Sequence, residues 1–243
     1  MTHYRGKGIF ITGTDTGIGK TTVGAALVAA LVATNQTVRV VKPVESGCLP
    51  DKEGNLMPAD ALELRHASSF PGCPLAEVNH YALAEPLAPA VAAERAGVEL
   101  DLAKCVNLVR QAQATADWVV VEGAGGLLVP LAGNRQSGYI TVADFIQLLG
   151  FPALVIARTR LGTINHTLLT LNELERRNMS CLGVILNQSD PQKGLEDEDN
   201  VHVLQALGVR VLATVPFIEQ FTSEEQIQYL QPVLDSLERS YQL

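Results

Sequence analysis

The hydrophobic positions of this 243-residue chain form short, nearly continuous runs and do not alternate with polar positions. Such runs are typical of parallel strands buried on both faces, because every side chain then meets apolar neighbours. Six runs rich in β-branched residues are predicted to be strands: 8–12, 38–42, 118–122, 153–157, 182–186 and 209–215. We therefore expect one central, mostly parallel sheet.

Helical patterns lie between these strands. Apolar residues share one helix face at positions 23, 26, 27, 30 and 31, and again at 164, 168, 171 and 174. Strands that alternate with helices are joined by right-handed crossovers, which place helices on both faces of a parallel sheet. The predicted fold class is α/β, a three-layer sandwich whose central sheet is flanked by helices.

One long interval, residues 43–116, departs from this alternation. It contains no convincing strand, and prolines at 71, 74, 86 and 89 punctuate it. Because it is too long for a plain crossover, we expect short helices that cover one end of the sheet. Ligands of open α/β sheets bind at the carboxyl ends of the strands, so that end is the predicted location of a site.

The C-terminal segment has Leu230, Leu234 and Leu237 at helical spacing, with Pro232 between them. We expect a terminal helix that docks on the protein and that the proline interrupts. No low-complexity linker divides the chain, so the prediction is a single domain spanning 1–243.

Composition narrows the classes of partner. The net charge of −8 argues against a broad surface for nucleic acid or for an anionic membrane, so a few local lysines must meet any anionic ligand. Cys48, Cys73, Cys105 and Cys181 do not have metal-ligand spacing, and we expect free thiols. We find neither a signal peptide nor an apolar stretch long enough to span a bilayer, and expect a cytoplasmic protein.

The stretch GTDTGIGKTT, which begins at Gly13, follows a predicted strand and opens a predicted helix. It resembles the phosphate loop GxxxxGK[ST], although Gly13 stands six positions before Gly19, one more than in that pattern. Gly17 and Gly19 would let backbone N–H groups converge on phosphate oxygens, and the helix would add its positive dipole end. Lys20 would reach the β- and γ-phosphates, and Thr21 would ligate Mg²⁺. A glycine-rich turn without a ligand is the alternative; the phosphate-loop interpretation makes the fold P-loop NTPase-like.

Charged residues follow the neighbouring strands. Lys42 ends the second predicted strand and would point toward the phosphate loop, unless it is an ordinary solvated lysine. Glu122 closes an apolar strand, where nucleotide hydrolases place a carboxylate that holds Mg²⁺. Asp60 is either a second metal carboxylate or a helix N-terminal residue that faces the dipole. Ser46 lies in the turn after Lys42, where a turn-forming serine is the default interpretation.

Two later stretches offer polar groups. A helix is predicted to begin near Gly162 or Thr163, and its first N–H groups could receive a carboxylate with Asn165 as an added donor. His166 has no visible partner and is read as a packed or surface histidine. Asn187 follows a strand, and its amide could pair with adenine or simply cap the turn.

Together these stretches resemble the dethiobiotin synthetase family. The family patterns GTDTxxGKT, KPVxSG and LGxINH are present as GTDTGIGKT, KPVESG and LGTINH, and VEGAGG is present unchanged. The segment AEPLAP matches a proline-bearing family pattern AEPxxP. Five matches in the family's order are far more specific than a lone phosphate loop.

The resemblance implies a homodimer that uses MgATP to close a ring on 7,8-diaminononanoate with carbon dioxide, a late step of biotin biosynthesis. An amine becomes a carbamate, the carbamate attacks the γ-phosphorus, and the second amine closes the ring to give dethiobiotin, ADP and phosphate. Lys42 would be the chief electrostatic catalyst, with Lys20 beside it. The partners implied are these small molecules, without nucleic acid or membrane.

Further roles follow from the same resemblance. Mg²⁺ would be held by Thr21, Asp60 and Glu122. Substrate would contact Ser46, Gly162, Thr163 and Asn165, the last three from the partner subunit. The residues expected to contact ATP are Gly17, Ile18, Gly19, Lys20, Thr21, Thr22, Asp60, Glu122, Gly123, Ala124, Gly125, Asn187, Gln188, Pro216, Phe217 and Ile218.

The chain departs from the family at three positions. Gly17 stands where some members carry an acidic residue, Arg160 where lysine is common, and Phe217 where tryptophan is frequent.

Two other classes share the phosphate loop. The cobyrinic acid amide-forming ligases usually carry an additional glutamine-hydrolysing domain, for which the segment after Leu186 is too short. The partitioning and cell-division ATPases carry a signature lysine at the position of Asp15.

Overall fold

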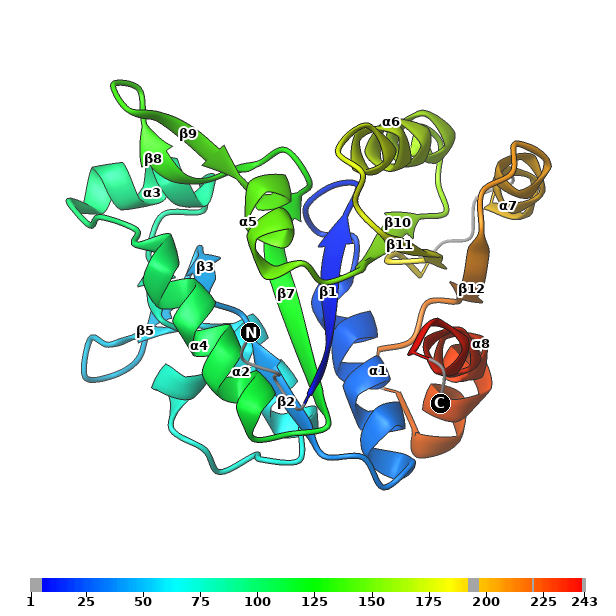
Figure 1. Cartoon of the computed structure of the whole chain (residues 1–243), viewed down its shortest axis with the longest axis horizontal. Coiled ribbons are helices and arrows are strands. Elements are labelled where there is room, and N and C mark those ends of the chain that lie inside the picture. The colour runs from blue at the N-terminus through cyan, green and yellow to red at the C-terminus, as the bar shows by residue number, and fades with distance from the viewer. Residues whose placement is uncertain (1–5, 192–196, 220, 242–243) are drawn as a thin grey trace.

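The computed structural model describes residues 6–191, 197–219 and 221–241. Its central sheet has six strands, all parallel, in the order β12-β11-β10-β1-β7-β2. The strands are β1 (Lys7–Gly13), β2 (Val38–Val41), β7 (Trp118–Gly126), β10 (Ala153–Arg158), β11 (Cys181–Asn187) and β12 (Val211–Val215). Each predicted strand is present, which confirms the parallel sheet (Figure 1).

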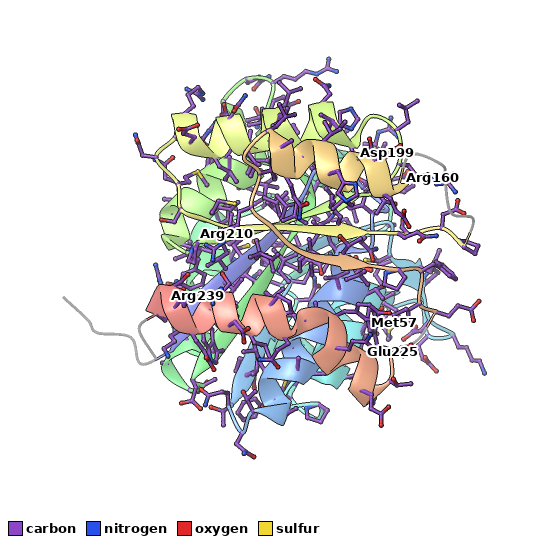
Figure 2. All side chains as sticks on the ribbon, turned by 90° about the vertical axis from the view of Figure 1, so that its right-hand side faces the viewer. Met57, Arg160, Asp199, Arg210, Glu225 and Arg239 are labelled. Carbon is purple, nitrogen blue, oxygen red and sulfur yellow. The ribbon has the colours of Figure 1, made fainter. Side chains whose placement is uncertain are left out.

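Helices cover both faces of this sheet. One face carries α1 (Lys20–Ala33), α2 (Ala59–Ala67) and α8 (Ser223–Tyr241); the other carries α4 (Leu102–Ala114), α5 (Val142–Leu149), α6 (Thr163–Arg176) and α7 (Asp197–Ala206). Side chains alternate between two cores, so that Ile9 and Ile11 of β1 face α1 while Phe10 faces α5. Figure 2 shows α7 and α8 on opposite sides of β11 and β12. The predicted three-layer α/β sandwich is confirmed.

The predicted helix faces are confirmed to different degrees. All five apolar residues predicted on α1 are buried. Of the four apolar residues predicted on α6, Leu174 is fully buried, whereas Ile164, Leu168 and Leu171 are partly buried against the core. The two predicted helix starts, near Lys20 and near Thr163, are correct.

The interval 43–116 contains more strand than predicted. β3 (Val44–Ser46) pairs in parallel with β6 (Tyr81–Leu83), and β4 (Leu49–Pro50) pairs antiparallel with β5 (Leu56–Met57). The expectation of no strand was wrong because strands of two or three residues are too short to show a period.

Helices in the same interval match the prediction only in part. Besides α2 it holds the 3₁₀ turn η1 (Leu75–Glu77) and the short helix α3 (Pro89–Ala96), as expected. The longer α4 is a face helix that packs on β2 and β7, and does not cover an end of the sheet. Outside the interval, a hairpin of β8 (Pro130–Asn134) and β9 (Gly138–Thr141) had not been predicted.

The terminal helix α8 runs through Pro232 without a break, so the predicted interruption was wrong. The proline removes one N–H, whose partner would be the carbonyl of Gln228, four residues earlier. Because Gln228 lies on the exposed side of the helix, water can satisfy that carbonyl. The helix docks as predicted, with Leu230, Leu234 and Leu237 buried. Among the described helices, none combines the length and the apolar character that crossing a membrane requires.

Candidate active site

The phosphate loop, residues 14–19, joins the carboxyl end of β1 to the first residue of α1; it is the dark blue loop after β1 in Figure 1. Gly17 and Gly19 have φ values of 69° and 84°, in the left-handed region that favours glycine. A Cβ on Gly19 would lie 2.2 Å from Nδ2 of Asn187 at the end of β11. That Nδ2 donates a hydrogen bond to the carbonyl oxygen of Ile18 at 2.9 Å. Glycine at position 19 therefore leaves room for the hydrogen bond between Asn187 and the loop.

Lys20 lies under this loop at the start of α1 and is 7% exposed. Its Nζ donates to the backbone carbonyl of Asp15 at 2.8 Å, while the Asp15 carboxylate forms an ion pair with Arg158 of β10. Burial lowers the pKa of Lys20 to about 8, although the carboxylate of Glu122 opposes this change. The lysine thus points back into a loop shaped to enclose an anion.

A charged cluster lies beside the loop, and its members come from four segments. Nζ of Lys42 lies 2.5 Å from Oε1 of Glu122 on β7 and 2.8 Å from Oδ2 of Asp60 on α2. Oγ1 of Thr21 on α1 donates to the same Oε1 at 2.9 Å. Two predicted cation ligands, Asp60 and Glu122, therefore contact the predicted catalytic lysine directly, and the third, Thr21, contacts Glu122.

Lys42 and Glu122 are 3% and 1% exposed, so their charges are paired and not solvated. Burial alone would lower the pKa of Lys42, but the carboxylates of Glu122 and Asp60 outweigh it and raise the pKa above the ordinary value. Lys42 therefore stays charged at physiological pH, and the alternative of a solvated lysine is wrong.

The backbone of Lys42 is held as firmly as its side chain. Its N–H donates to the carbonyl of Val78 at 2.9 Å, and its carbonyl accepts from Nδ2 of the buried Asn79 at 2.8 Å. The residue that follows β2 is thereby anchored to the segment that leads into β6.

The residues of the charged cluster line a cleft of about 420 Å³ at the carboxyl ends of the strands. Most residues predicted to bind ATP, metal or substrate line it: Gly17, Gly19, Lys20, Thr21, Thr22, Lys42, Ser46, Asp60, Glu122, Ala124, Gly125, Asn187, Gln188, Pro216, Phe217 and Ile218. Two predicted residues lie behind its wall: Ile18 is buried in the core, and Gly123 packs against the ring of Phe10.

Five further residues line the cleft and had not been predicted: Thr16, Glu45, Glu63, Ser189 and Phe221. Glu45 is 6% exposed, and burial raises the pKa of its carboxyl. Burial raises the pKa of Glu63 as well, together with the nearby charge of Asp60. The sequence places this carboxylate only three positions after Lys42, between Val44 and Ser46.

The predicted substrate residues of α6 do not line this cleft. Thr163 is buried, its hydroxyl donates to the carbonyl of Arg158 at 2.6 Å, and its N–H donates to the carbonyl of Arg160 at 3.1 Å. Gly162 and Asn165 are exposed at the start of the helix. Within one chain, the first turn of α6 therefore lies outside the cleft that Lys42 lines.

A second hollow, of about 510 Å³, lies beside α6. Leu127, Leu128 and Val129 line one side of it, and His166 and Leu169 of α6 line the other. Leu128 and Leu169 are 54% and 60% exposed. We call these two leucines and the hollow between them the α6 apolar face.

The structure shows what surrounds the three residues that depart from the family pattern. A Cβ on Gly17 would meet nothing within 4 Å, so a larger residue there would point into open space, at the strain of a positive φ. Phe217 lines the cleft, and Arg160 forms an ion pair with Asp190 at 3.1 Å.

The four cysteines form no disulfide with one another. Cys48, Cys73, Cys105 and Cys181 are free, as predicted. Within the described residues no group of three or more His, Cys, Asp or Glu side chains is arranged to hold a metal ion. Burial raises the pKa of Cys48 to about 11 and that of Cys105 to about 12, which makes both thiols poor nucleophiles.

Comparison with solved structures identifies the fold. A ParA family ATPase from Chlorobium tepidum TLS matches with a TM-score of 0.52 and 14% identity, over 95% of this chain and 92% of that one. The MinC:MinD cell division protein complex of Aquifex aeolicus matches with a TM-score of 0.52 and 14% identity, over 98% and 96% of the two chains. At this identity the likeness shows a shared P-loop fold and does not favour the partitioning alternative.

Comparison with known sequences identifies the family. A domain family described as "AAA domain" matches residues 7–225. The ATP-dependent dethiobiotin synthetase of Anaeromyxobacter sp. (strain K) is 46% identical over 186 residues, 76% of this chain and 78% of the relative. Those of Nitrosospira multiformis and Thermodesulfovibrio yellowstonii are 40% and 36% identical, over 87% and 90% of this chain and 89% and 92% of their own. The chain belongs to the ATP-dependent dethiobiotin synthetase family.

Proposed function

We propose that the chain carboxylates 7,8-diaminononanoate and closes its ureido ring at the expense of ATP, yielding dethiobiotin, ADP and phosphate. The observation that carries this proposal is the Lys42 ammonium, buried beside the phosphate loop between Glu122 and Asp60. A fixed positive charge at that place suits a reaction in which two anions, a carbamate and a γ-phosphate, must meet. The names of the relatives point to the same reaction.

ATP would bind with its phosphates in the loop and its base between β11 and the segment after β12. The loop supplies backbone N–H groups. The helix α1 supplies the positive end of its dipole and the ammonium of Lys20. The Oδ1 of Asn187 would accept from the adenine N6 amino group, while its Nδ2 donates to the carbonyl of Ile18 in the loop. Pro216, Phe217 and Ile218 supply an apolar border.

A divalent cation fits the charge and the donors of this cleft. Its lining carries two lysines, Lys20 and Lys42, and four carboxylates, those of Glu45, Asp60, Glu63 and Glu122. A polyphosphate would add more negative charge, which a bound cation would offset.

The carboxylates of Asp60 and Glu122 already contact a positive charge, the Lys42 ammonium, and the Thr21 hydroxyl donates to Glu122. Hard oxygen ligands suit Mg²⁺, and these three residues would hold it directly or through water. When bound, the ion would supply charge neutralisation on the phosphates.

The residues of the chain would act mainly by holding and neutralising charge. A neutral amine of the substrate forms a carbamate with carbon dioxide, and a carbamate oxygen attacks the γ-phosphorus while ADP leaves. The second amine then attacks the activated carbonyl and phosphate leaves, which closes the ring. Lys42 would neutralise charge on the carbamate and the transferring phosphoryl group, with Lys20 beside it, because both remain close to the loop. Ser46, half-buried at the cleft, would contact the substrate.

The active unit we propose is a homodimer. Gly162 and Asn165 would bind the distal carboxylate of the substrate from the partner subunit, since they are exposed and do not line the cleft of their own chain. Thr163 is buried with its hydroxyl and N–H already paired, so it would shape this turn. The α6 apolar face supports a contact there, because exposed leucines beside a hollow are typical of interfaces. Free thiols suit a reducing compartment, and we propose the cytoplasm.

The deciding assay supplies the purified protein with ATP, Mg²⁺, bicarbonate and 7,8-diaminononanoate, and detects dethiobiotin by mass spectrometry. We expect dethiobiotin and ADP in equal amounts, and no dethiobiotin when any one component is left out. ATP hydrolysis without dethiobiotin would refute the reaction and favour another P-loop ATPase.

A further inference from the structure

The helix α2, which carries Asp60, begins without a side-chain cap of its own. Its N-cap residue is Pro58, whose side chain has no hydrogen-bond acceptor. The first N–H groups of a helix have no partner within the helix, and a buried donor left unpaired costs free energy. Another segment must therefore supply the acceptors.

Glu45 supplies them from β3. Its Oε1 accepts from the backbone N–H of Asp60 at 3.0 Å, and its Oε2 accepts from the N–H of Ala61 at 3.0 Å. Both carboxylate oxygens are thus engaged by the first turn of one helix. Charge-assisted bonds of this kind and the positive end of the helix dipole offset the burial of the carboxylate.

This cap links the segment that carries Lys42 to the helix that carries Asp60. Glu45 lies three residues after Lys42, so one short segment holds both the lysine and the acceptor for α2. The backbone N–H of Asp60 donates to Glu45, and the Oδ2 of Asp60 lies 2.8 Å from Nζ of Lys42. The side chain of Asp60 is 44% exposed, so packing contributes little to its orientation and the backbone anchor matters more.

We infer that Glu45 is a positioning residue, which fixes the first turn of α2 so that the Asp60 carboxylate faces Lys42 and the divalent cation. The inference rests on the proposed function only in taking Asp60 as a cation ligand. Glu45 itself acts through Asp60 and takes no part in the reaction. Outer contacts of this kind commonly tune metal affinity by about 10–100-fold.

The test measures binding of ADP by calorimetry over a series of Mg²⁺ concentrations and without Mg²⁺. For Glu45→Ala we expect the apparent Mg²⁺ affinity in the presence of ADP to fall by about 10–100-fold, with a smaller change in binding of ADP alone. Glu45→Gln keeps one acceptor and should show an intermediate loss. If Glu45→Ala does not fold, the comparison of Glu45→Gln with wild type carries the test.

Asp101 provides a control because its carboxylate also caps a helix, although it is the N-cap residue of that helix and is exposed. Its Oδ1 accepts from the N–H groups of Ala103 and Lys104 at 2.9 and 3.4 Å at the start of α4, outside the cleft. Asp101→Ala should lower the melting temperature without changing the Mg²⁺ affinity. If Glu45→Ala likewise lowers only the melting temperature, Glu45 is an ordinary cap and the inference is wrong.

A double variant separates positioning from simple loss of charge. In an Asp60→Ala background, Glu45→Ala should cause no further loss of Mg²⁺ affinity, because Glu45 acts only through Asp60. An equal loss in both backgrounds would instead indicate a direct effect of the Glu45 charge on the cation and would overturn the inference. These measurements need no dethiobiotin, so they remain valid if the proposed reaction fails.

Discussion

The Lys42 cleft and the N-terminal turn of α6 belong to neighbouring strand ends, yet they are built in opposite ways. In the cleft, Lys42 and Glu122 are almost fully buried and paired at 2.5 Å. At the α6 turn, Asn165 is exposed and Leu169 nearby is 60% exposed. Buried charges have to be satisfied within the chain that buries them, whereas an exposed polar turn beside apolar residues can serve a second subunit. The comparison indicates that one chain completes the charge-handling part of the site and leaves the substrate-carboxylate part to its partner.

The largest expected effect lies in the cleft. Lys42→Ala should reduce turnover on the order of 10³-fold, because the transition state loses its buried positive charge. The variant should remain a folded dimer that still binds ATP, since the loop and Lys20 are unchanged. Dethiobiotin formation measures the first property, and calorimetry and ultracentrifugation measure the others. Near-normal turnover would refute Lys42 as the chief catalyst.

At the α6 apolar face, Leu169→Glu should convert the dimer to a monomer, because a carboxylate cannot be buried there without a partner. Turnover should fall by at least about tenfold, the equivalent of one hydrogen bond to a charged group, while ATP binding stays as in wild type. Sedimentation velocity measures the mass. Leu207→Glu, at an equally exposed leucine beyond α7, is the control and should leave the dimer intact. A dimer of normal stability in Leu169→Glu would place the interface elsewhere.

Within the α6 turn, Asn165→Ala should raise the KM for 7,8-diaminononanoate by about tenfold, the usual effect of losing one hydrogen bond to a charged group. The KM for ATP should not change, because Asn165 does not line the Lys42 cleft. Steady-state kinetics with each substrate varied in turn supplies both values. Equal changes in the two KM values would mean that Asn165 affects ATP binding in the Lys42 cleft as well as binding of the diamine.

The smallest expected effect concerns the attachment of α6 to α5. Arg177, which follows α6, contacts Asp144 of α5 and Glu173 of α6, both at 2.6 Å. Burial would raise the pKa of Asp144, but hydrogen bonds from Thr141 and Arg177 outweigh it and lower the pKa below the ordinary 3.8. Because the pair is partly exposed, Asp144→Asn should cost about 1 kcal/mol of unfolding free energy or less at neutral pH.

The pH dependence of that cost has a defined sign. A carboxyl with a lowered folded pKa contributes stability above its ordinary pKa and loses it as the pH falls through the folded value. Wild type and Asp144→Asn should therefore differ at pH 7 and converge below pH 3.8. Urea unfolding at several pH values measures the difference, and a constant difference would show that the charge of Asp144 is not responsible.

The candidate site was predictable where its residues end a strand or begin a helix. Lys42, Glu122 and Lys20 follow or close long apolar runs, so their common location follows from the parallel sheet alone. Asp60 was ambiguous because a helix N-terminal aspartate has a local explanation, and only its 2.8 Å contact with Lys42 assigns it to the cluster. Glu45 was missed because its partners are backbone N–H groups 15 and 16 residues away.

The sequence by itself determined the six strands, the helices α1, α6 and α8, the phosphate loop and the family motifs. Each depends on neighbouring residues whose period of apolar positions or glycine spacing can be read locally. Only the tertiary structure decided the pairing of β3 with β6, the unbroken α8, the cap that Glu45 places on α2 and the separation of the α6 turn from the cleft. These depend on contacts between distant segments, whose free energy comes from burial and hydrogen bonds that exist only once the chain has folded.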